Sequence, residues 1–233
     1  MDVLSPNKNK NLFISVDGVQ YARMPVKTHV ILEKDDLKTI LSQYLKPYLK
    51  EGDVIFISEK IVAITQGRSY PIKDIKPSFL AKILVKFVHK TPSGIGIGSP
   101  WTMELAVREA GTIKIFLAAL VAAITKPFGI KGMFYRIAGK EVAAIDGPCD
   151  YTLPPYNKYA KLGPKNPAAV AEFLKGKIGY DVMIIDANDL GVSVLGKSSK
   201  NISDDWARKV FRDNPLGQTN EQTPLCIVRK TNK

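Results

Sequence analysis

The chain reads Val142-Ala-Ala-Ile-Asp146-Gly-Pro-Cys-Asp150 in one place and Val182-Met-Ile-Ile-Asp186-Ala-Asn-Asp189 in another. Each short apolar run is typical of a buried strand, and each is followed by a pair of aspartates. Open α/β sheets bind ligands at the carboxyl ends of their strands. Carboxylates held there bind hard cations such as Mg²⁺ or Mn²⁺, which in turn carry nucleotide phosphates. The alternative is that these aspartates are turn residues, because Asp146-Gly-Pro also suits a turn.

Composition indicates an ordinary globular protein. The 233 residues are enough for one large domain or two small ones. Hydrophobic residues make up 45% of the chain and charged residues 24%, as in most globular proteins. Expected hairpins alternate with expected helices, which predicts an α/β or α+β fold with a mixed β-sheet. We expect a single unit over 1–233, with two lobes at about 21–146 and 147–233.

The net charge of +12 favours an anionic partner. Nucleotides and polyglutamates fit this charge, as would a nucleic acid. The basic residues are spread along the chain, and no RNA-binding, helix-turn-helix or zinc-finger signature occurs, so we do not expect a nucleic-acid partner.

Cysteine usage and the N-terminus predict a cytoplasmic protein. Cys149 and Cys226 are too few and too far apart for a disulfide framework or a zinc site. The N-terminus lacks the apolar core of a signal peptide. The most apolar stretch, 115–124, is too short to span a bilayer, so we expect a buried helix there and no membrane partner.

Local patterns predict the elements that surround the aspartates. Asp35-Asp36 should cap a helix that ends near Lys46, and Ser99-Pro100 should begin one that stops at Gly111. Strands are expected at 26–32, at 54–58 and at 181–186. A hairpin of strands at 133–137 and 141–145 should deliver Asp146.

A second candidate site is the segment Gly191-Val-Ser-Val-Leu-Gly196-Lys197-Ser198, which fits the P-loop pattern letter for letter. A P-loop wraps phosphates between a strand and a helix N-terminus. Here the interior residues Val192 and Val194 are strand formers, and the residues after Ser198 begin a helix poorly. A P-loop nucleotidase is therefore the weaker alternative.

With both aspartate runs placed, the chain resembles the coenzyme F420-0:gamma-glutamyl ligase family from about Arg23 to Arg229. The order and spacing of five short segments carry the resemblance. They are Met24-Pro25-Val26-Lys27 with the helix start after it; Gly52-Asp53-Val54 through Gln66-Gly67-Arg68, similar to the family's "GDV…EGR" strand pair; Ala144-Ile145-Asp146, similar to its "GID" metal segment; Ile184-Ile185-Asp186-Ala187-Asn188, similar to its "ITDTN" metal segment; and Gly217-Gln218 through Pro224 with Val228-Arg229.

The resemblance implies an enzyme that uses GTP, or ATP, and Mg²⁺ or Mn²⁺ to activate a carboxylate as an acyl phosphate. The amine of L-glutamate then attacks, and the small-molecule acceptor is coenzyme F420-0 or a related acid such as a folate. The family is typically a homodimer. The implied nucleotide-binding residues are Met24, Pro25, Val26, Lys27, Gly217, Gln218, Thr219 and Asn220, and the implied metal ligands are Asp146, Asp186, Ala187 and Gln218. The sequence identifies no catalytic residue.

Three departures from the family pattern motivate an alternative, a catalytically inactive homologue that still binds nucleotide and metal. Ile64 stands where the family usually has a lysine, Ala187 where it has a threonine, and Cys149 where it has an asparagine. Asp150 and Asp189 match no family position, and we interpret them as turn residues.

Overall fold

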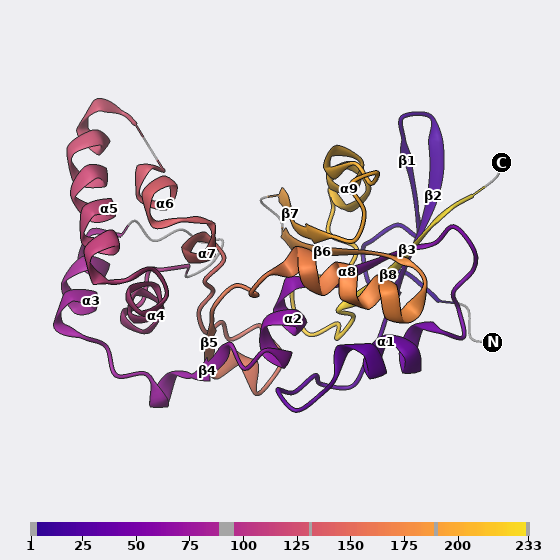
Figure 1. Ribbon diagram of the computed structural model, residues 1–233, viewed down its shortest axis with the longest axis horizontal. Coiled ribbons are helices and arrows are strands. Elements are labelled where there is room, and N and C mark those ends of the chain that lie inside the picture. Colours follow the sequence, from indigo (N-terminus) through magenta and orange to yellow (C-terminus); the bar gives the residue numbers. More distant parts are fainter. Residues whose placement is uncertain (1–3, 89–95, 131, 189–190, 232–233) are drawn as a thin grey trace. The chain divides into compact units, whose positions relative to one another are not determined.

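The structure is a computed structural model that describes residues 4–88, 96–130, 132–188 and 191–231. The chain divides into two units: Met1–Gln66 with Lys165–Lys233, and Gly67–Pro164. The second unit is thus an insertion within the first, and Figure 1 shows both. These units do not coincide with the lobes at 21–146 and 147–233 that we expected, because the chain returns to the first unit only at Lys165.

A mixed sheet forms the centre of the first unit. Within the described residues its strands run in the order β1-β2-β8-β3-β6-β7. Only β3 and β6 are paired in parallel, and the other neighbours are antiparallel. The strands are β1 (Phe13–Val16), β2 (Val19–Val26), β3 (Val54–Ser58), β6 (Asp181–Asn188), β7 (Gly191–Lys197) and β8 (Leu225–Lys230). The expected mixed α/β fold is confirmed.

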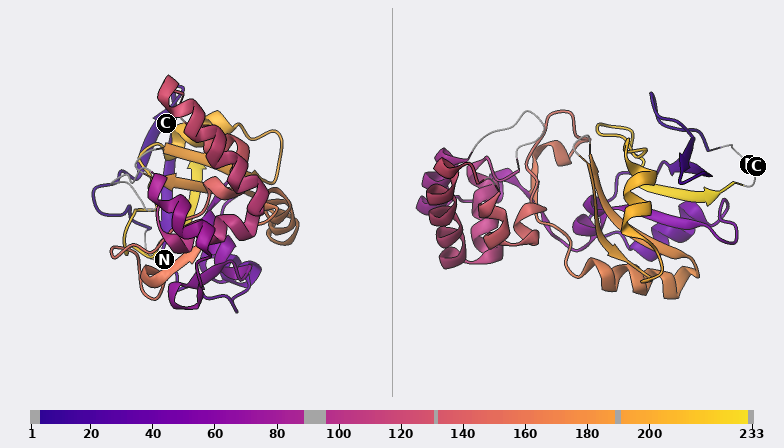
Figure 2. Two further views of the ribbon diagram at one scale, coloured as in Figure 1. Left: turned by 90° about the vertical axis from the view of Figure 1, so that its left-hand side faces the viewer. Right: turned by 90° about the horizontal axis from the view of Figure 1, so that it is seen from above.

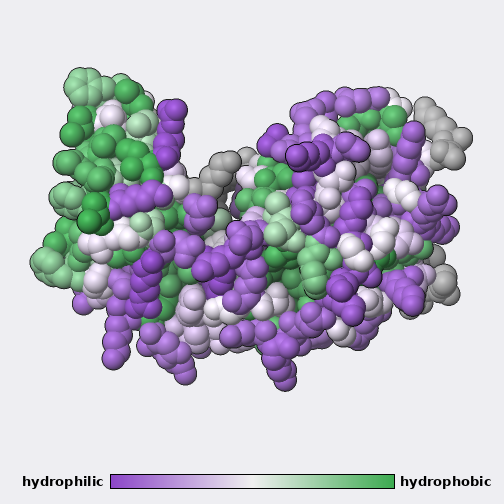
Figure 3. Space-filling model, viewed as in Figure 1, coloured by the Kyte–Doolittle hydropathy of each residue, from purple (hydrophilic) through white to green (hydrophobic). Residues whose placement is uncertain are grey.

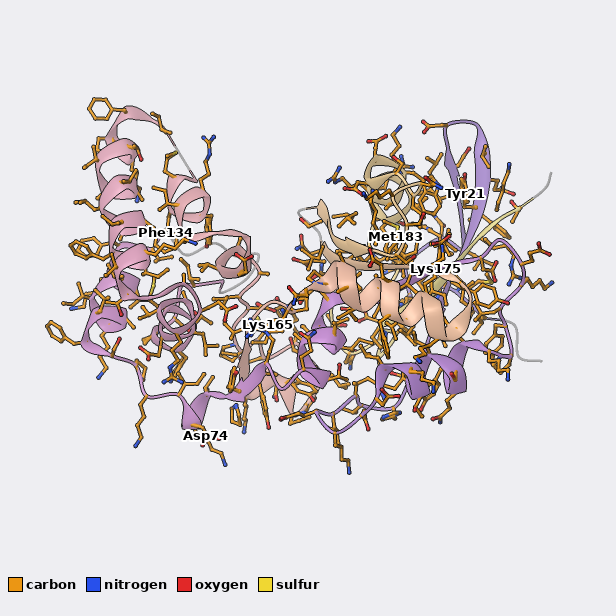
Figure 4. All side chains as sticks on the ribbon, in the orientation of Figure 1. Tyr21, Asp74, Phe134, Lys165, Lys175 and Met183 are labelled. Atoms are coloured by element: carbon orange, nitrogen blue, oxygen red, sulfur yellow. The ribbon has the colours of Figure 1, made fainter. Side chains whose placement is uncertain are left out.

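Helices cover both faces of this sheet. Helix α8 packs on β6 and β7 and against α1, whereas α9 packs on the opposite face against β7 and β1 (Figures 1 and 2). On the α9 side, Phe56 stacks on Phe211 with ring centroids 4.2 Å apart, and Met183, labelled in Figure 4, belongs to the same core. The helices of this unit are α1 (Leu37–Leu45), α2 (Glu59–Thr65), α8 (Pro167–Ile178) and α9 (Asp204–Phe211).

The strand predicted at 26–32 is wrong in its position. The strand is β2, which lies between β1 and β8 and ends at Val26. After Val26 the backbone turns away from the ladder, and the Thr28 amide donates to the Gln222 carbonyl at 3.1 Å. The apolar residues after Val26 suggested a strand, but Ile31 is buried in the core without being part of one.

Helix starts were predicted well because their signals are local. The Asp36 carboxylate accepts from the Thr39 amide at 2.9 Å, which caps α1 and holds the pKa of Asp36 below its ordinary value. Ser99 and Thr102 form a reciprocal capping box at the start of α4, with Pro100 in the first position. That helix stops at Gly111, where φ is 87°.

The segment after β3 is a helix, so the resemblance to a strand pair holds only for its first strand. Ser58 ends β3 and caps α2, its hydroxyl accepting from the Lys60 amide at 3.4 Å. The apolar residues of α2 do not alternate as in a strand, since Ile61 through Ile64 are all buried.

The second unit is mostly helical within the described residues. It has one small sheet of β4 paired with β5. Its elements are β4 (Ser69–Pro71), η1 (Ile72–Asp74), α3 (Phe79–Leu84), η2 (Val85–Phe87), α4 (Pro100–Ala110), α5 (Thr112–Thr125), η3 (Lys126–Phe128), α6 (Met133–Ala138), α7 (Lys140–Ala143), η4 (Tyr156–Lys158) and β5 (Tyr159–Lys161).

The hairpin predicted at 133–145 is wrong, because α6 and α7 occupy those residues. Phe134, Ile137, Ala138 and Val142 all pack into the core of the second unit. Their spacing of three or four residues is helical, whereas a strand would bury every second residue. The sequence contains both patterns here, and packing against α5 selects the helical one.

The apolar helix predicted at 115–124 exists as α5, but it is not buried. Along its length, only the side chains of Ile115 and Ala118 are buried. Large apolar side chains on its other side are exposed, including Ile113 and Phe116. No helix among the described residues is both long and apolar enough to cross a membrane.

A pH-dependent contact joins α8, β6 and β7. The Asp181 carboxylate accepts from the Lys175 ammonium at 2.8 Å and from the Ser198 hydroxyl at 2.7 Å; Lys175 is labelled on α8 in Figure 4. Burial raises the pKa of Asp181, but these two hydrogen bonds outweigh it, so the pKa lies below its ordinary value of 3.8. The contact therefore stabilises the fold above that value and is lost as the pH falls through the lowered pKa.

We expect Asp181→Asn to lower the melting temperature at pH 7, and the difference from the wild type to shrink below about pH 3.8. Thermal melts of both proteins between pH 7 and pH 2.5 would measure this. Asp150→Asn, which changes an exposed turn residue, is the matched control. A difference that stays constant down to pH 2.5 would contradict the assignment.

Candidate functional site

Two of the predicted nucleotide-binding segments lie together at the end of β2 and the start of β8. Met24–Val26 forms the last part of β2 and pairs with the first residues of β8. Just beyond, the Gln222 side-chain amide donates to the Thr28 carbonyl at 2.6 Å, and the Thr28 amide donates to the Gln222 carbonyl. Lys27 is exposed between these contacts. Residues far apart in the chain thus place Lys27 beside the loop at 217–222.

That loop already holds a negatively charged group. Gly217 adopts φ 82°, and a Cβ there would lie 2.4 Å from Cδ of Glu221. The Thr219 amide donates to the Glu221 carboxylate at 2.7 Å, and the Thr219 hydroxyl donates to it at 3.1 Å. A backbone N–H that binds a carboxylate has the geometry and polarity to bind a phosphate oxygen. Gln218 is partly buried, while Thr219 and Asn220 are exposed.

Asp186 belongs to the same unit and lies within a strand, not after its end. Strand β6 continues to Asn188 because it pairs with β7, with Asp186 opposite Ser193. The preceding residue, Ile185, is in register with Ser58 of the parallel strand β3. Asp186 is only partly buried, so its carboxylate is accessible at the carboxyl ends of the two parallel strands.

Ala187 points away from Asp186. Its side chain packs with Ile185 in the core on the α9 side, as expected from the alternation of a strand. The residue is opposite Val192 in the β6–β7 ladder. A methyl group offers no metal ligand, so only the backbone carbonyl of Ala187 has that chemistry.

Glu59 is an acidic residue that our sequence reasoning missed. It begins α2 directly after β3, one residue beyond the position in register with Ile185. Glu59 and Asp186 therefore follow neighbouring parallel strands at the same edge of the sheet, and Glu59 is 6% exposed. The signal was available: 54–58 is an apolar run followed by a carboxylate, the same rule that selected Asp146 and Asp186.

Asp146 lies in the second unit, where a single bridge holds its backbone. The Asp146 amide donates to the Lys161 carbonyl at 3.0 Å, and the Lys161 amide donates back at 2.9 Å. The Asp146 carboxylate accepts from the Gly147 amide at 2.9 Å. Asp150 is exposed in a turn, which confirms its interpretation as a turn residue, whereas Asp189 lies outside the described residues.

Two basic residues of the second unit are buried, one of them paired with Asp146 through its backbone, and our sequence reasoning identified neither as part of a site. Lys161, 5% exposed, directs its ammonium toward the Ala144 carbonyl at 3.5 Å. Arg68, 7% exposed, donates to the Gly163 carbonyl at 2.6 Å and pairs with Glu109 at 2.7 Å. No local pattern marks a lysine as buried, because burial of Lys161 results from pairing between segments distant in sequence.

The predicted metal ligands divide between the units. Asp186, Ala187 and Gln218 belong to the first unit and Asp146 to the second. Within the part of the chain that the structure describes, no group of three or more His, Cys, Asp or Glu side chains is placed to hold a metal ion.

The P-loop interpretation of 191–198 is wrong. These residues form β7 as far as Lys197, and the Lys197 ammonium binds the Asp204 carboxylate and the Ile202 carbonyl, both at 2.7 Å. A P-loop requires a loop that leads directly into a helix. Here Gly196 packs under α8, where a Cβ would lie 2.3 Å from the Pro167 carbonyl carbon. The glycine thus allows helix and strand to approach each other closely.

The family model for F420-0:gamma-glutamyl ligase matches residues 25–194. The chain belongs to the F420-0:gamma-glutamyl ligase family. No curated protein matches the chain. Both Asp146 and Asp186 fall inside the region that matches the ligase family, as does Lys161. Met24 and the loop at 217–222 fall outside it, so the family match does not extend to that part of the predicted nucleotide site.

Proposed function

We propose that this protein is a metal- and nucleotide-dependent ligase that joins L-glutamate to a carboxylate acceptor through an acyl phosphate. The observation that carries the proposal is the ligase-family match over 25–194, which contains both aspartates. Coenzyme F420-0 is the first acceptor to test, and a related acid such as a folate is the second.

In this proposal the nucleotide binds to the first unit. Lys27 and the loop at 217–222 lie together, and the Thr219 amide already binds a carboxylate. The nucleotide, L-glutamate and the carboxylate acceptor are all anions. The exposed Lys27 and the net charge of +12 therefore both favour their binding. Binding of a phosphate at the Thr219 amide would displace the Glu221 carboxylate.

The chemistry of the predicted ligands, although not yet a shared position within the described residues, also suits a hard cation. The predicted ligands Asp146, Asp186 and Gln218 offer carboxylate and amide oxygens, which Mg²⁺ and Mn²⁺ prefer. When bound, such a cation neutralises phosphate charge during phosphoryl transfer. Asp186 is the accessible carboxylate at the sheet edge, and the buried neighbour Glu59 adds negative charge to the same edge.

The proposed reaction has two steps that balance. A carboxylate oxygen of the acceptor attacks the γ-phosphorus, and the nucleoside diphosphate leaves. The amine nitrogen of glutamate then attacks the acyl carbon, inorganic phosphate leaves, and the nitrogen loses a proton to form the amide. The chain's own residues hold the anions together, so that attack occurs within one complex and not between separate molecules in solution.

The test is an acceptor panel. Purified protein is incubated with GTP or ATP, Mn²⁺ or Mg²⁺, glutamate and each acceptor, and both phosphate release and the mass of the acceptor are followed. We expect acceptor-dependent phosphate release and a glutamyl mass gain on one acceptor. Nucleotide binding without turnover on any acceptor would instead favour the inactive homologue, which Ile64, Ala187 and Cys149 motivate.

A further inference from the structure

Most of the exposed large hydrophobic side chains belong to one stretch of the chain. Among the described residues 14 such side chains are exposed, and ten of them lie between residues 79 and 130. Figure 3 shows apolar residues gathered over α3 and α5, and both helices pack against α4. The five exposed side chains of α5 are Ile113, Phe116, Leu117, Leu120 and Ile124. We call the exposed apolar side chains between 79 and 130 the α3–α5 face.

The α3–α5 face is larger than a soluble surface normally carries. Its phenylalanines project far from the fold, since Phe79, Phe87 and Phe128 are 79%, 75% and 78% exposed. If a large apolar side chain offers about 200 Å² when fully exposed, the ten side chains together offer roughly 1,200 Å². The largest apolar patch on a typical monomer covers about 300–600 Å², and larger patches mark interaction sites. The extent of the face therefore indicates a binding surface.

The charge around the α3–α5 face is positive. From residue 76 to residue 130 the sequence has seven basic residues and two acidic ones. Both acidic side chains are engaged by arginines. The Glu104 carboxylate accepts from Arg108 at 2.9 Å, and the Glu109 carboxylate accepts from Arg68 at 2.7 Å. Neither carboxylate therefore offsets the charge of the lysines in this stretch.

Exposed lysines accompany the apolar side chains of the face. Lys82 and Lys86 follow Phe79 by three and seven positions, so all three lie on the same side of the continuous helix formed by α3 and η2. Lys126 is exposed at the end of α5, two positions before Phe128. Apolar side chains flanked by ammonium groups match a surface that has an apolar interior and an anionic outer layer. An anionic lipid bilayer is such a surface.

A protein partner fits α5 less well. From Ile115 to Ile124 no side chain can donate or accept a hydrogen bond. Protein interfaces carry about one hydrogen bond per 100–200 Å², whereas the acyl region of a bilayer requires none from the side chains that enter it. A second copy of the chain would also bring like charges together, because a two-fold interface places the same lysines on both sides.

We propose that the α3–α5 face docks on the surface of a membrane that contains anionic lipid. The phenylalanines enter the boundary between headgroups and acyl chains, and the lysines bind the lipid phosphates. The sequence predicted no membrane partner because α5 is too short to cross a bilayer, but docking on the surface requires no spanning helix. The inference rests on the exposed face and does not depend on the ligase activity.

The first test is flotation of the full chain with vesicles. Vesicles of phosphatidylcholine alone are compared with vesicles that contain about 40% phosphatidylglycerol, at about 0.05 M and about 0.5 M salt. We expect the protein to float with the anionic vesicles at low salt. The bound fraction should fall when salt is added or when phosphatidylglycerol is left out. A wild type that floats with neither kind of vesicle overturns the proposal.

The second test removes apolar side chains from the face. Phe79→Ser/Phe128→Ser should weaken partitioning into anionic vesicles at least ten-fold, because two large side chains no longer leave water on docking. Phe173→Ser, which changes a side chain of α8 that is 55% exposed, is the matched control and should partition like the wild type. Circular dichroism checks that both variants are folded. Equal partitioning of the folded double variant and the wild type would contradict the proposal.

The third test removes charge and leaves the apolar side chains in place. Lys82→Gln/Lys86→Gln should weaken partitioning about 25-fold at low salt, since each lysine near an anionic surface contributes about five-fold. Lys38→Gln/Lys46→Gln removes two exposed lysines at α1 in the first unit and is the control for net charge. If the control loses as much binding as the test variant, the net charge of the chain, and not this face, is responsible.

A fluorescent label then shows which surface touches lipid. In a Cys149→Ser background only the buried Cys226 remains, so an added exposed cysteine is labelled selectively. An environment-sensitive fluorophore at Phe128→Cys should report an apolar environment when anionic vesicles are added, whereas one at Phe173→Cys should not. A response at Phe173→Cys alone would overturn the proposal.

Sedimentation velocity distinguishes a second copy from a membrane. We expect Phe79→Ser/Phe128→Ser to leave the mass of the wild type in solution unchanged. If the wild type sediments at twice the 25.7 kDa of one chain, and this variant at the single-chain mass with unchanged flotation, the face binds another copy and the proposal is wrong.

Discussion

Replacement of Asp186 by asparagine is expected to lower turnover about a thousand-fold while leaving the fold intact. The change removes one negative charge from the accessible carboxylate at the ends of β3 and β6 but retains the size of the side chain. A neutral amide is a poorer ligand for Mg²⁺ or Mn²⁺ than a carboxylate. The loss is measured as steady-state phosphate release with the acceptor that gains a glutamyl group in the panel. Calorimetric titration with Mn²⁺ shows whether the cation still binds.

Asp146→Asn is the companion variant in the other unit, and we expect a loss of similar size. If the lost charge acts through the cation, raising the Mn²⁺ concentration should restore part of the activity of either variant. Asp150→Asn serves as the control, because Asp150 is an exposed turn residue a few positions from Asp146. Turnover of Asp186→Asn within two-fold of the wild type would remove Asp186 from the proposed site.

The second large effect concerns stability. Arg229→Met is expected to lower the free energy of unfolding by about 3 kcal/mol. Arg229 forms a two-pronged ion pair with Asp53, with both N–O distances at 2.7 Å, and the Asp53 side chain is fully buried. Without the guanidinium, the buried Asp53 carboxylate keeps its hydrogen bond from the Lys50 amide, at 2.7 Å, but loses its countercharge. Urea unfolding, followed by circular dichroism, measures the difference.

Two variants test this explanation. Arg212→Met removes an exposed arginine and should change the free energy by less than about 0.5 kcal/mol. The double variant Arg229→Met/Asp53→Leu should recover part of the stability, because it no longer buries an unpaired charge. If the double variant is as unstable as the sum of its single changes, the ion pair is not the cause. Asp53 is the aspartate of the "GDV" segment, so the structure gives that motif residue a structural role.

The strands that position Asp186 were predictable, because an apolar run is a local signal. Apolar runs predicted β3 and β6, and the parallel pairing of these strands brings their carboxyl ends together. The same rule, applied once more, would have found Glu59. The meeting of Lys27 with the loop at 217–222 was not predictable from spacing, because it results from the pairing of β2 with β8 across most of the chain.

The incorrect hairpin prediction arose where two patterns compete, whereas the weaker weight given to a P-loop at 191–198 is confirmed. Residues 133–145 suit both a hairpin and a pair of helices, and the side chains at 134, 137, 138 and 142 settle the matter by packing into one core. The segment at 191–198 has P-loop spacing, but its valines pair with β6 and its lysine binds Asp204. In each case the decisive partner is a neighbouring element, so the outcome depends on packing between elements and not on the pattern within one of them.

By itself, the sequence determined the helix caps, the buried strands, the mixed fold class and the resemblance that the family match confirms. These depend on a residue's own chemistry and on neighbours within a few positions. Only the tertiary structure decided that the second unit is inserted into the first, that Asp146 and Asp186 belong to different units, and that α5 is exposed. Burial is a property of what packs against a residue, and a list of apolar residues does not contain it.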